Sequence, residues 1–150
     1  MITFNKVKDI QPGKSGYNLY LKVVSKAVLI DIKRLEVVKH FIENIRIHDI
    51  SNRKHIAHDF DDEDGDTVRF YIEHHLEELA TDDLNQLVGA NKKTADRPGL
   101  LLQQLHLVRV GLYPDSADQF AIFDYSIGQE LTNYLVVINT DENGNLNYMT

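Results

Sequence analysis

Hydrophobic residues in the last third of the chain fall in short runs that predict antiparallel β-strands. The runs LHLVRVGLY, FAIFDYSI and YLVVIN are rich in β-branched and aromatic residues, and NLNY is a shorter, more polar one. Turn-forming PDSADQ, GQELT and DENG separate them. Residues 105–148 are therefore expected to form successive strands. Asn143-Gly144 in the last turn suits a two-residue connection with positive φ at both positions.

The first hairpin has a defined register. If Tyr113 pairs with Phe120, the side chains that alternate along the two strands fall on two different faces. One face places Arg109 directly opposite Asp124. The other face is wholly apolar and pairs Val110 with Phe123, Leu112 with Ala121, and Val108 with Tyr125. A shift by one residue would set apolar side chains against charges, so this register is well specified.

Upstream, the hydrophobic period changes and predicts helices after a short strand region. Strands are expected over residues 17–23 and 27–32, and the first residues could add an edge strand. The predicted helices span residues 33–47, 52–58, 67–80, 81–88 and 98–104. The second is expected to be capped by Asp49 or Ser51, and the third by Asp66. Phe70 projects toward the polar side of the third helix, where packing on a neighbouring element is favoured over exposure to a partner.

These elements predict one α+β domain over residues 1–150. Its core would be a mainly antiparallel sheet of about six strands, with four to five helices packed on it. The length is sufficient for one domain with a proper hydrophobic core. The chain shows no internal repeat, low-complexity segment or linker that would divide it.

Composition agrees with a globular protein and excludes several classes of function. The chain is 43% hydrophobic and 26% charged, and it contains no cysteine, which excludes disulfides and thiolate metal sites. No run of apolar residues resembles a signal peptide or a membrane span, so we expect a cytoplasmic protein without a membrane partner.

The charge is acidic and unevenly distributed. The formal net charge is -7, and residues 1–58 hold 11 Lys and Arg against five Asp and Glu, whereas the remainder holds five against 18. The favoured explanation of this asymmetry is that two oppositely charged parts of one domain attract each other. The alternative is that the uneven charge attracts a binding partner. No basic stripe is interleaved with aromatic residues, so nucleic acid is not an expected partner. The oligomeric state is open.

Two groups of residues could bind a metal ion. His55 and His58 lie three residues apart, Asp59 follows directly, and His75 could join them from the next helix. A hydrogen-bonded core position is the favoured interpretation of His75, because it lies within an apolar stripe. The acidic run 59–66 lacks two key ligands of the EF-hand pattern, so a solvated acidic loop is favoured over a low-affinity cation site. No cofactor is therefore expected, and a divalent metal is the alternative.

A second candidate site lies on the predicted sheet. Arg109 and Asp124 are charged residues inside otherwise apolar strands, and the register places them face to face with Tyr113 further along. A charge in such a place is costly unless it is paired, so mutual pairing is the first explanation. The alternative is a patch that binds a small anionic ligand through Arg109. No GxSxG or phosphate-binding loop is present.

Three stretches of the chain resemble a known family. They are GDTVRFYIEHHLEEL, LHLVRVGLYPD and FAIFDYSIGQELTNYLVVINTDENG. Together they resemble a bacterial family catalogued as a domain of unknown function, number two-thousand-four. The resemblance covers about the last ninety residues closely and implies a small, cytoplasmic α+β protein of bacterial origin. It assigns no catalytic residue or cofactor to any position.

The sequence favours a binding role over catalysis. Because no catalytic pattern is complete, the expected function is a non-enzymatic interaction or regulatory module with an acidic surface and a protein partner. The first alternative is a metal-dependent hydrolase using His55, His58 and Asp59. The second is a binder of small anionic ligands at Arg109, Tyr113 and Asp124.

Overall fold

The structure is a computed structural model that describes residues 20–23 and 32–150. For residues 20–23 and Ile32 only the backbone is described. The elements are β1 (Tyr20–Val23), α2 (Ile32–Glu43), α3 (Ile45–Asp61), α4 (Val68–Glu78), α5 (Thr81–Val88), the 3-10 turn η1 (Thr94–Asp96), α6 (Arg97–Gln104), β2 (His106–Leu112), β3 (Ala121–Ser126), β4 (Val136–Thr140) and β5 (Leu146–Met149). The expected edge strand at the start lies outside the described residues. The expected strand over residues 27–32 also lies outside them except for Ile32, which begins α2.

The described strands form one sheet in the order β1-β2-β3-β4-β5. The strands β2 to β5 pair with one another in antiparallel orientation, and β1 pairs with β2 in parallel. The α+β class with an antiparallel sheet and five α-helices is thus confirmed for this part of the chain. The expected number of about six strands is wrong, because four antiparallel strands and the short parallel β1 account for the whole described sheet.

The register of the first hairpin is confirmed at its central pairs. Arg109 lies opposite Asp124, and the apolar pairs are those expected: Val110 with Phe123, and Leu112 with Ala121. The predicted partnership of Val108 with Tyr125 is wrong, because Leu107 takes that place. A bulge between Leu107 and Arg109 inserts one extra residue, which shifts the pairing beyond it.

The turn between β4 and β5 differs from the predicted two-residue turn. Gly144 has φ of 82°, but Asn143 does not have positive φ. The amide of Gly144 donates to the carbonyl of Asp141 at 3.1 Å, and the amide of Asp141 donates to the carbonyl of Asn145 at 3.0 Å. This is a three-residue connection in which a turn is followed by a left-handed glycine. The Asp141 carboxylate accepts three further hydrogen bonds from Asn143 and Asn145, which favours this longer turn.

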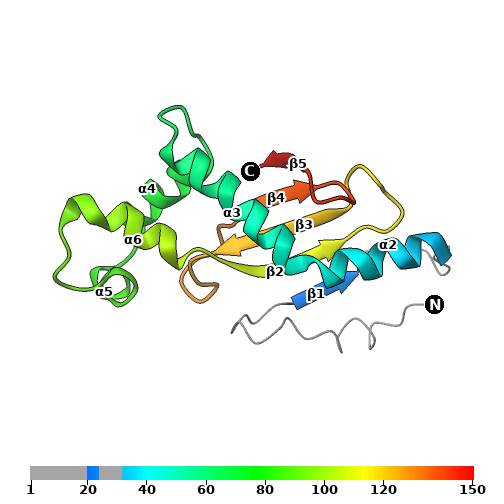
Figure 1. The fold of residues 1–150 in the computed structure, drawn as a ribbon. Coiled ribbons are helices and arrows are strands. Elements are labelled where there is room, and N and C mark those ends of the chain that lie inside the picture. Colours follow the sequence, from blue (N-terminus) through cyan, green and yellow to red (C-terminus); the bar gives the residue numbers. More distant parts are fainter. Residues whose placement is uncertain (1–19, 24–31) are drawn as a thin grey trace.

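The helices α2 and α3 lie over one face of the sheet, whereas α4, α5 and α6 lie at one end of it (Figure 1). The Phe41 ring from α2 lies 4.9 Å from that of Phe120 and 6.0 Å from that of Phe123. From α3, Asp49 accepts a hydrogen bond from the Tyr125 hydroxyl at 2.8 Å. One continuous hydrophobic core therefore joins the helices to the sheet.

The predicted helix over residues 33–47 has the expected apolar stripe but different ends. Asn44 separates α2 from α3 and donates from its side chain to the carbonyl of His40 at 2.8 Å. The predicted helix over residues 52–58 is the interior of the longer α3, so neither Asp49 nor Ser51 is a cap. The side chains that α3 buries include Asp49 and Asn52, and these polar residues hide its helical period in the sequence.

Candidate functional site

A cleft of about 470 Å³ lies beside α4, between this helix and the segment that precedes β4. Most of its lining is aromatic or apolar, and Asp66 is the one acidic side chain among the lining residues that the structure describes. The lining residues are Asp66, Thr67, Phe70, Tyr71, His74, His75, Tyr134, Leu135, Met149 and Thr150. The cleft thus combines one helix with two segments that lie more than fifty residues further along the chain, and we refer to it as the aromatic cleft.

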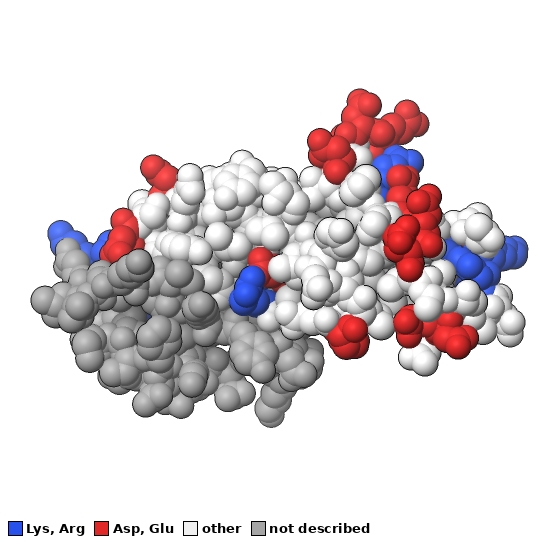
Figure 2. Space-filling model, turned by 180° about the vertical axis from the view of Figure 1, so that it is seen from behind, with Lys and Arg blue, Asp and Glu red and all other residues white. Residues whose placement is uncertain are grey.

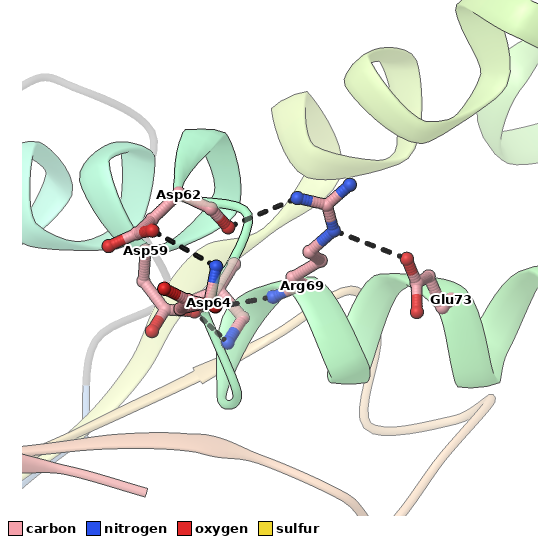
Figure 3. Close-up of polar contacts among 6 residues, drawn as sticks. Asp59, Asp62, Asp64, Arg69 and Glu73 are labelled. Carbon is pink, nitrogen blue, oxygen red and sulfur yellow. Dashed lines mark hydrogen bonds and ion pairs between the residues drawn. The ribbon is translucent and has the colours of Figure 1, made fainter.

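The start of α4 is held by the preceding helix. The carboxylate of Asp59 accepts hydrogen bonds from the amides of Val68 at 2.6 Å and Arg69 at 3.3 Å (Figure 3). The prediction that Asp66 is the N-cap is therefore wrong: Thr67 occupies that position, and Asp59 reaches it from across the loop. A carboxylate there also interacts favourably with the helix dipole. Gly65 permits the tight loop, because a Cβ at this position would lie 1.9 Å from the carbonyl oxygen of Asp59.

His75 connects α4 to the opposite wall of the cleft. The ring is 2% exposed, and its Nδ1 lies 2.7 Å from the carbonyl of Tyr71. Because a carbonyl only accepts, Nδ1 carries the proton and Nε2 accepts from the hydroxyl of Thr132 at 2.8 Å. The same hydroxyl oxygen accepts from the amide of Tyr134 at 3.1 Å. The favoured interpretation of His75 as a hydrogen-bonded core histidine is confirmed, and burial lowers its pKa, which keeps the ring neutral.

Tyr71 provides a second connection between the same two walls. Its hydroxyl donates to the carbonyl of Tyr134 at 3.4 Å and accepts from the amide of Ile127 at 3.2 Å. Burial raises the pKa of this phenol, so it remains protonated at neutral pH. Together, Tyr71 and His75 hold the backbone of the segment that presents the Tyr134 ring.

Two aromatic side chains at the cleft are largely exposed. Phe70 is 67% exposed and Tyr134 is 63% exposed, so the expected packing of Phe70 on a neighbouring element is wrong. The ring of His74 lies between them, stacked on Phe70 at 6.2 Å and edge-on to Tyr134 at 5.1 Å. The result is a contiguous row of three rings on the surface. Large apolar side chains exposed together around a concavity are typical of a binding surface.

A second cleft adjoins the aromatic cleft. It has a volume of about 620 Å³ and shares the side chains of His74, His75 and Tyr134 with the aromatic cleft. Glu78 also lines it. His74 and Tyr134 are therefore a common wall, and a bound segment could contact both hollows.

Acidic residues surround this end of the molecule. Figure 2 shows Asp and Glu side chains gathered over the end that carries the connection from α3 to α4. The exposed carboxylates from the end of α3, through the connection, to α4 itself, which we call the acidic rim, are Asp61, Asp62, Glu63, Asp64, Asp66, Glu73, Glu77 and Glu78. The guanidinium of Arg69 in their midst pairs with Glu73 at 3.4 Å and donates to the carbonyl of Asp62 at 3.0 Å (Figure 3). The helix that lines the cleft and the connection before it are therefore mainly acidic, and Asp66 of the rim lines the cleft itself.

The four metal candidates are dispersed. His55 and His58 lie on α3, where His58 is exposed. The carboxylate of Asp59 accepts a hydrogen bond from the amide of Val68 at the start of α4. Both nitrogens of His75 have protein partners. Among the described residues, no three His, Asp or Glu side chains are placed to hold a metal ion together. Metal binding by these residues stays a prediction.

The candidate pair on the sheet forms an ion pair. The guanidinium of Arg109 contacts the carboxylate of Asp124, and the carboxylate is buried whereas the guanidinium is half exposed. Tyr113 lies beyond the end of β2, four residues from Arg109, which is roughly 13 Å along a strand. The structure therefore joins Arg109 with Asp124 but does not bring Tyr113 beside them. Anion binding by Arg109 stays a prediction.

Most of the aromatic cleft has no signal in the sequence. The pattern predicts Tyr134 as the first residue of a strand, but Tyr134 precedes β4, and Thr132 lies in the turn before it. The sequence signal for the cleft is Phe70, an aromatic residue on the polar side of an amphipathic helix.

Comparisons with known proteins identified no relative of this chain. No family model matches the chain, and no curated protein or solved structure is significantly similar to it. The resemblance to the domain of unknown function therefore stays a prediction.

Proposed function

We propose that the protein is a cytoplasmic, non-enzymatic interaction module that binds a partner protein at the aromatic cleft. The observation that carries this proposal is the row formed by Phe70, His74 and Tyr134, two of whose rings are mostly exposed beside a cleft. Aromatic residues at a concave, partly desolvated surface contribute most of the binding energy in many protein interfaces.

Charge complementarity supports a basic partner. The acidic rim borders the cleft on α4 and on the loop before it, and the nearby Arg69 is paired with Glu73. A partner segment with basic residues around an apolar side chain would match both the cleft and its border. Such complementarity speeds association and excludes acidic partners.

Selection from a random peptide library displayed on phage tests this proposal without a known partner. Peptides enriched on the wild-type protein are synthesised, and their dissociation constants are measured by calorimetry. We expect Tyr134→Ala to weaken binding by roughly tenfold or more, as for an aromatic hot spot. Ile47→Ala is the matched control, because Ile47 is 62% exposed on α3.

Two results would contradict the proposal. The first is that no peptide is enriched above background. The second is that the enriched peptides bind the Tyr134 and Ile47 variants equally well. Thermal unfolding of both variants establishes that each is folded, which is expected because both side chains are mostly exposed.

Arg109 supports a second candidate function. Its side chain is 53% exposed whereas that of Asp124 is 3% exposed, so part of the guanidinium faces solvent and could meet a small carboxylate. Thermal-shift measurements with a panel of carboxylates test this candidate. The expected result is stabilisation that Arg109→Gln abolishes, and the absence of any shift would remove the candidate.

A further inference from the structure

The rings of the aromatic cleft present a surface that attracts cations. The faces of Phe, Tyr and Trp carry negative charge density, and an ammonium or guanidinium group within about 6 Å of a ring centroid is attracted to it. Phe70 and Tyr134 are the two exposed rings, and the buried Tyr71 also lines the cleft. A neutral apolar ligand could contact the same rings, but it would not be attracted electrostatically to their faces.

The charged groups around the cleft favour a cation as well. The lining contains the carboxylate of Asp66 and no Lys or Arg. Arg69 on the same helix is directed to Glu73 and to the carbonyl of Asp62 (Figure 3). His75 is neutral because burial lowers its pKa. A cation in the cleft would therefore meet one carboxylate and several rings without an opposing lysine or arginine.

The apolar part of the lining matches the stem of a long basic side chain. Leu135 and Met149 line the cleft together with the aromatic rings. A lysine buries its four methylene groups along apolar surface while its ammonium group stays near polar atoms or water. A volume of about 470 Å³ is ample for one such side chain.

We propose that the aromatic cleft takes up the side chain of a lysine from the partner protein, with its ammonium group against the exposed aromatic rings of the cleft and near the carboxylate of Asp66. This inference rests on the proposed function, because it names the group that the docking surface selects. It differs from the simpler arrangement in which an apolar side chain fills the cleft and basic residues contact only the acidic rim.

A pair of peptides that differ only in charge tests the proposal. The probe is a capped pentapeptide with one lysine between alanines, and its partner carries acetyl-lysine instead, which removes the charge. Binding is followed through the aromatic NMR signals of the protein at constant ionic strength. We expect the lysine peptide to shift the signals of Phe70 and Tyr134 and to bind several-fold more tightly than the acetylated peptide. Equal binding of the two peptides would overturn the proposal.

Substitutions assign the preference to the rings and the carboxylate. Tyr134→Leu is expected to weaken binding of the lysine peptide about two- to fivefold, the usual size of an exposed cation–π contact. Tyr134→Phe keeps the ring and should retain affinity. Asp66→Asn should weaken binding of the lysine peptide and leave the acetylated peptide unchanged. Equal affinity in all three variants would overturn the proposal.

Choline and its uncharged analogue 3,3-dimethylbutan-1-ol distinguish a partner lysine from a small free amine. The proposal predicts that choline binds more tightly than the analogue but less tightly than the lysine peptide. Choline binding more tightly than the peptide would overturn the assignment to a partner protein. If peptides selected on phage depend on Tyr134 but contain no basic residue, the lysine proposal fails whereas the proposed docking function stands.

Discussion

Single residues decide where the chain turns and where helices begin. The pairing of Arg109 with Asp124 could be predicted, because two opposite charges inside apolar strands indicate only one register. The bulge beside Leu107 could not, because an extra strand residue leaves no periodic signal. The cap of α4 was assigned to the adjacent Asp66, whereas the carboxylate that binds the helix amides belongs to Asp59. Local sequence pattern thus points to the carboxylate nearest in the sequence as the cap of a helix, even where a more distant carboxylate accepts the hydrogen bonds.

Gly144 is the residue whose replacement should be most revealing in the β4–β5 turn. It has φ of 82°, and a Cβ at this position would lie 2.2 Å from Nδ1 of His48. The His48 ring cannot easily move away from this Cβ, because it stacks on the ring of Phe41 with a centroid distance of 4.2 Å. Gly144→Ala should therefore lower the free energy of unfolding by about 1–3 kcal/mol, measured by urea denaturation.

Gly99→Ala is the control for this prediction. Gly99 lies in α6, and a Cβ there would have no atom within 4 Å. The substitution should raise stability by about 0.5–1 kcal/mol, because alanine favours the helix over the unfolded chain. Equal effects of the two substitutions would contradict the account of the turn.

At the scale of elements, the apolar stripes of α2 and α4 could be read from the sequence, but the extent of α3 could not. Asp49 and Asn52 occupy buried positions of α3. The carboxylate of Asp49 accepts a hydrogen bond from the hydroxyl of Tyr125 on β3. A polar residue whose partner lies on a distant strand looks like a loop residue in the sequence. The sequence predicts His75 as a hydrogen-bonded core histidine, but it does not indicate the partner, Thr132, which lies in a turn.

The connection through His75 predicts that stability falls as the pH is lowered. The pKa of His75 lies below the ordinary value of 6.5, because burial disfavours the charged ring. Below about pH 6.5 the unfolded chain therefore takes up a proton that the folded chain does not, and the free energy of unfolding falls until the folded pKa is reached. Each pKa unit between the two states corresponds to about 1.4 kcal/mol. The pKa of His48 is lowered by burial in the same direction.

Urea denaturation at pH 7.5 and pH 5.5 checks this prediction. His75→Gln removes one titrating ring, so the loss of stability between the two pH values should be smaller than in the wild type. His106→Gln is the control, because His106 is exposed. An unchanged pH dependence in the His75 variant would contradict the assignment of the ring as buried and neutral.

At the scale of the whole molecule, the fold class followed from local patterns, whereas the candidate site did not. Alternation and helical period are properties of neighbouring residues, and they were sufficient to predict an antiparallel sheet covered by helices. The aromatic cleft brings α4 together with Tyr134 and Met149, which are distant in sequence. It arises from tertiary packing, and the misplaced Phe70 was the only local indication of it.

The central claim is that partners bind at the aromatic cleft and not at the ion pair on the sheet. It is tested most directly by NMR mapping of a peptide selected on phage, with assigned backbone and aromatic signals. The account predicts that the largest shifts occur at Phe70, His74 and Tyr134, and that Arg109 and Asp124 are unaffected. Shifts confined to the surroundings of Arg109 and Asp124, with none at α4, would contradict it.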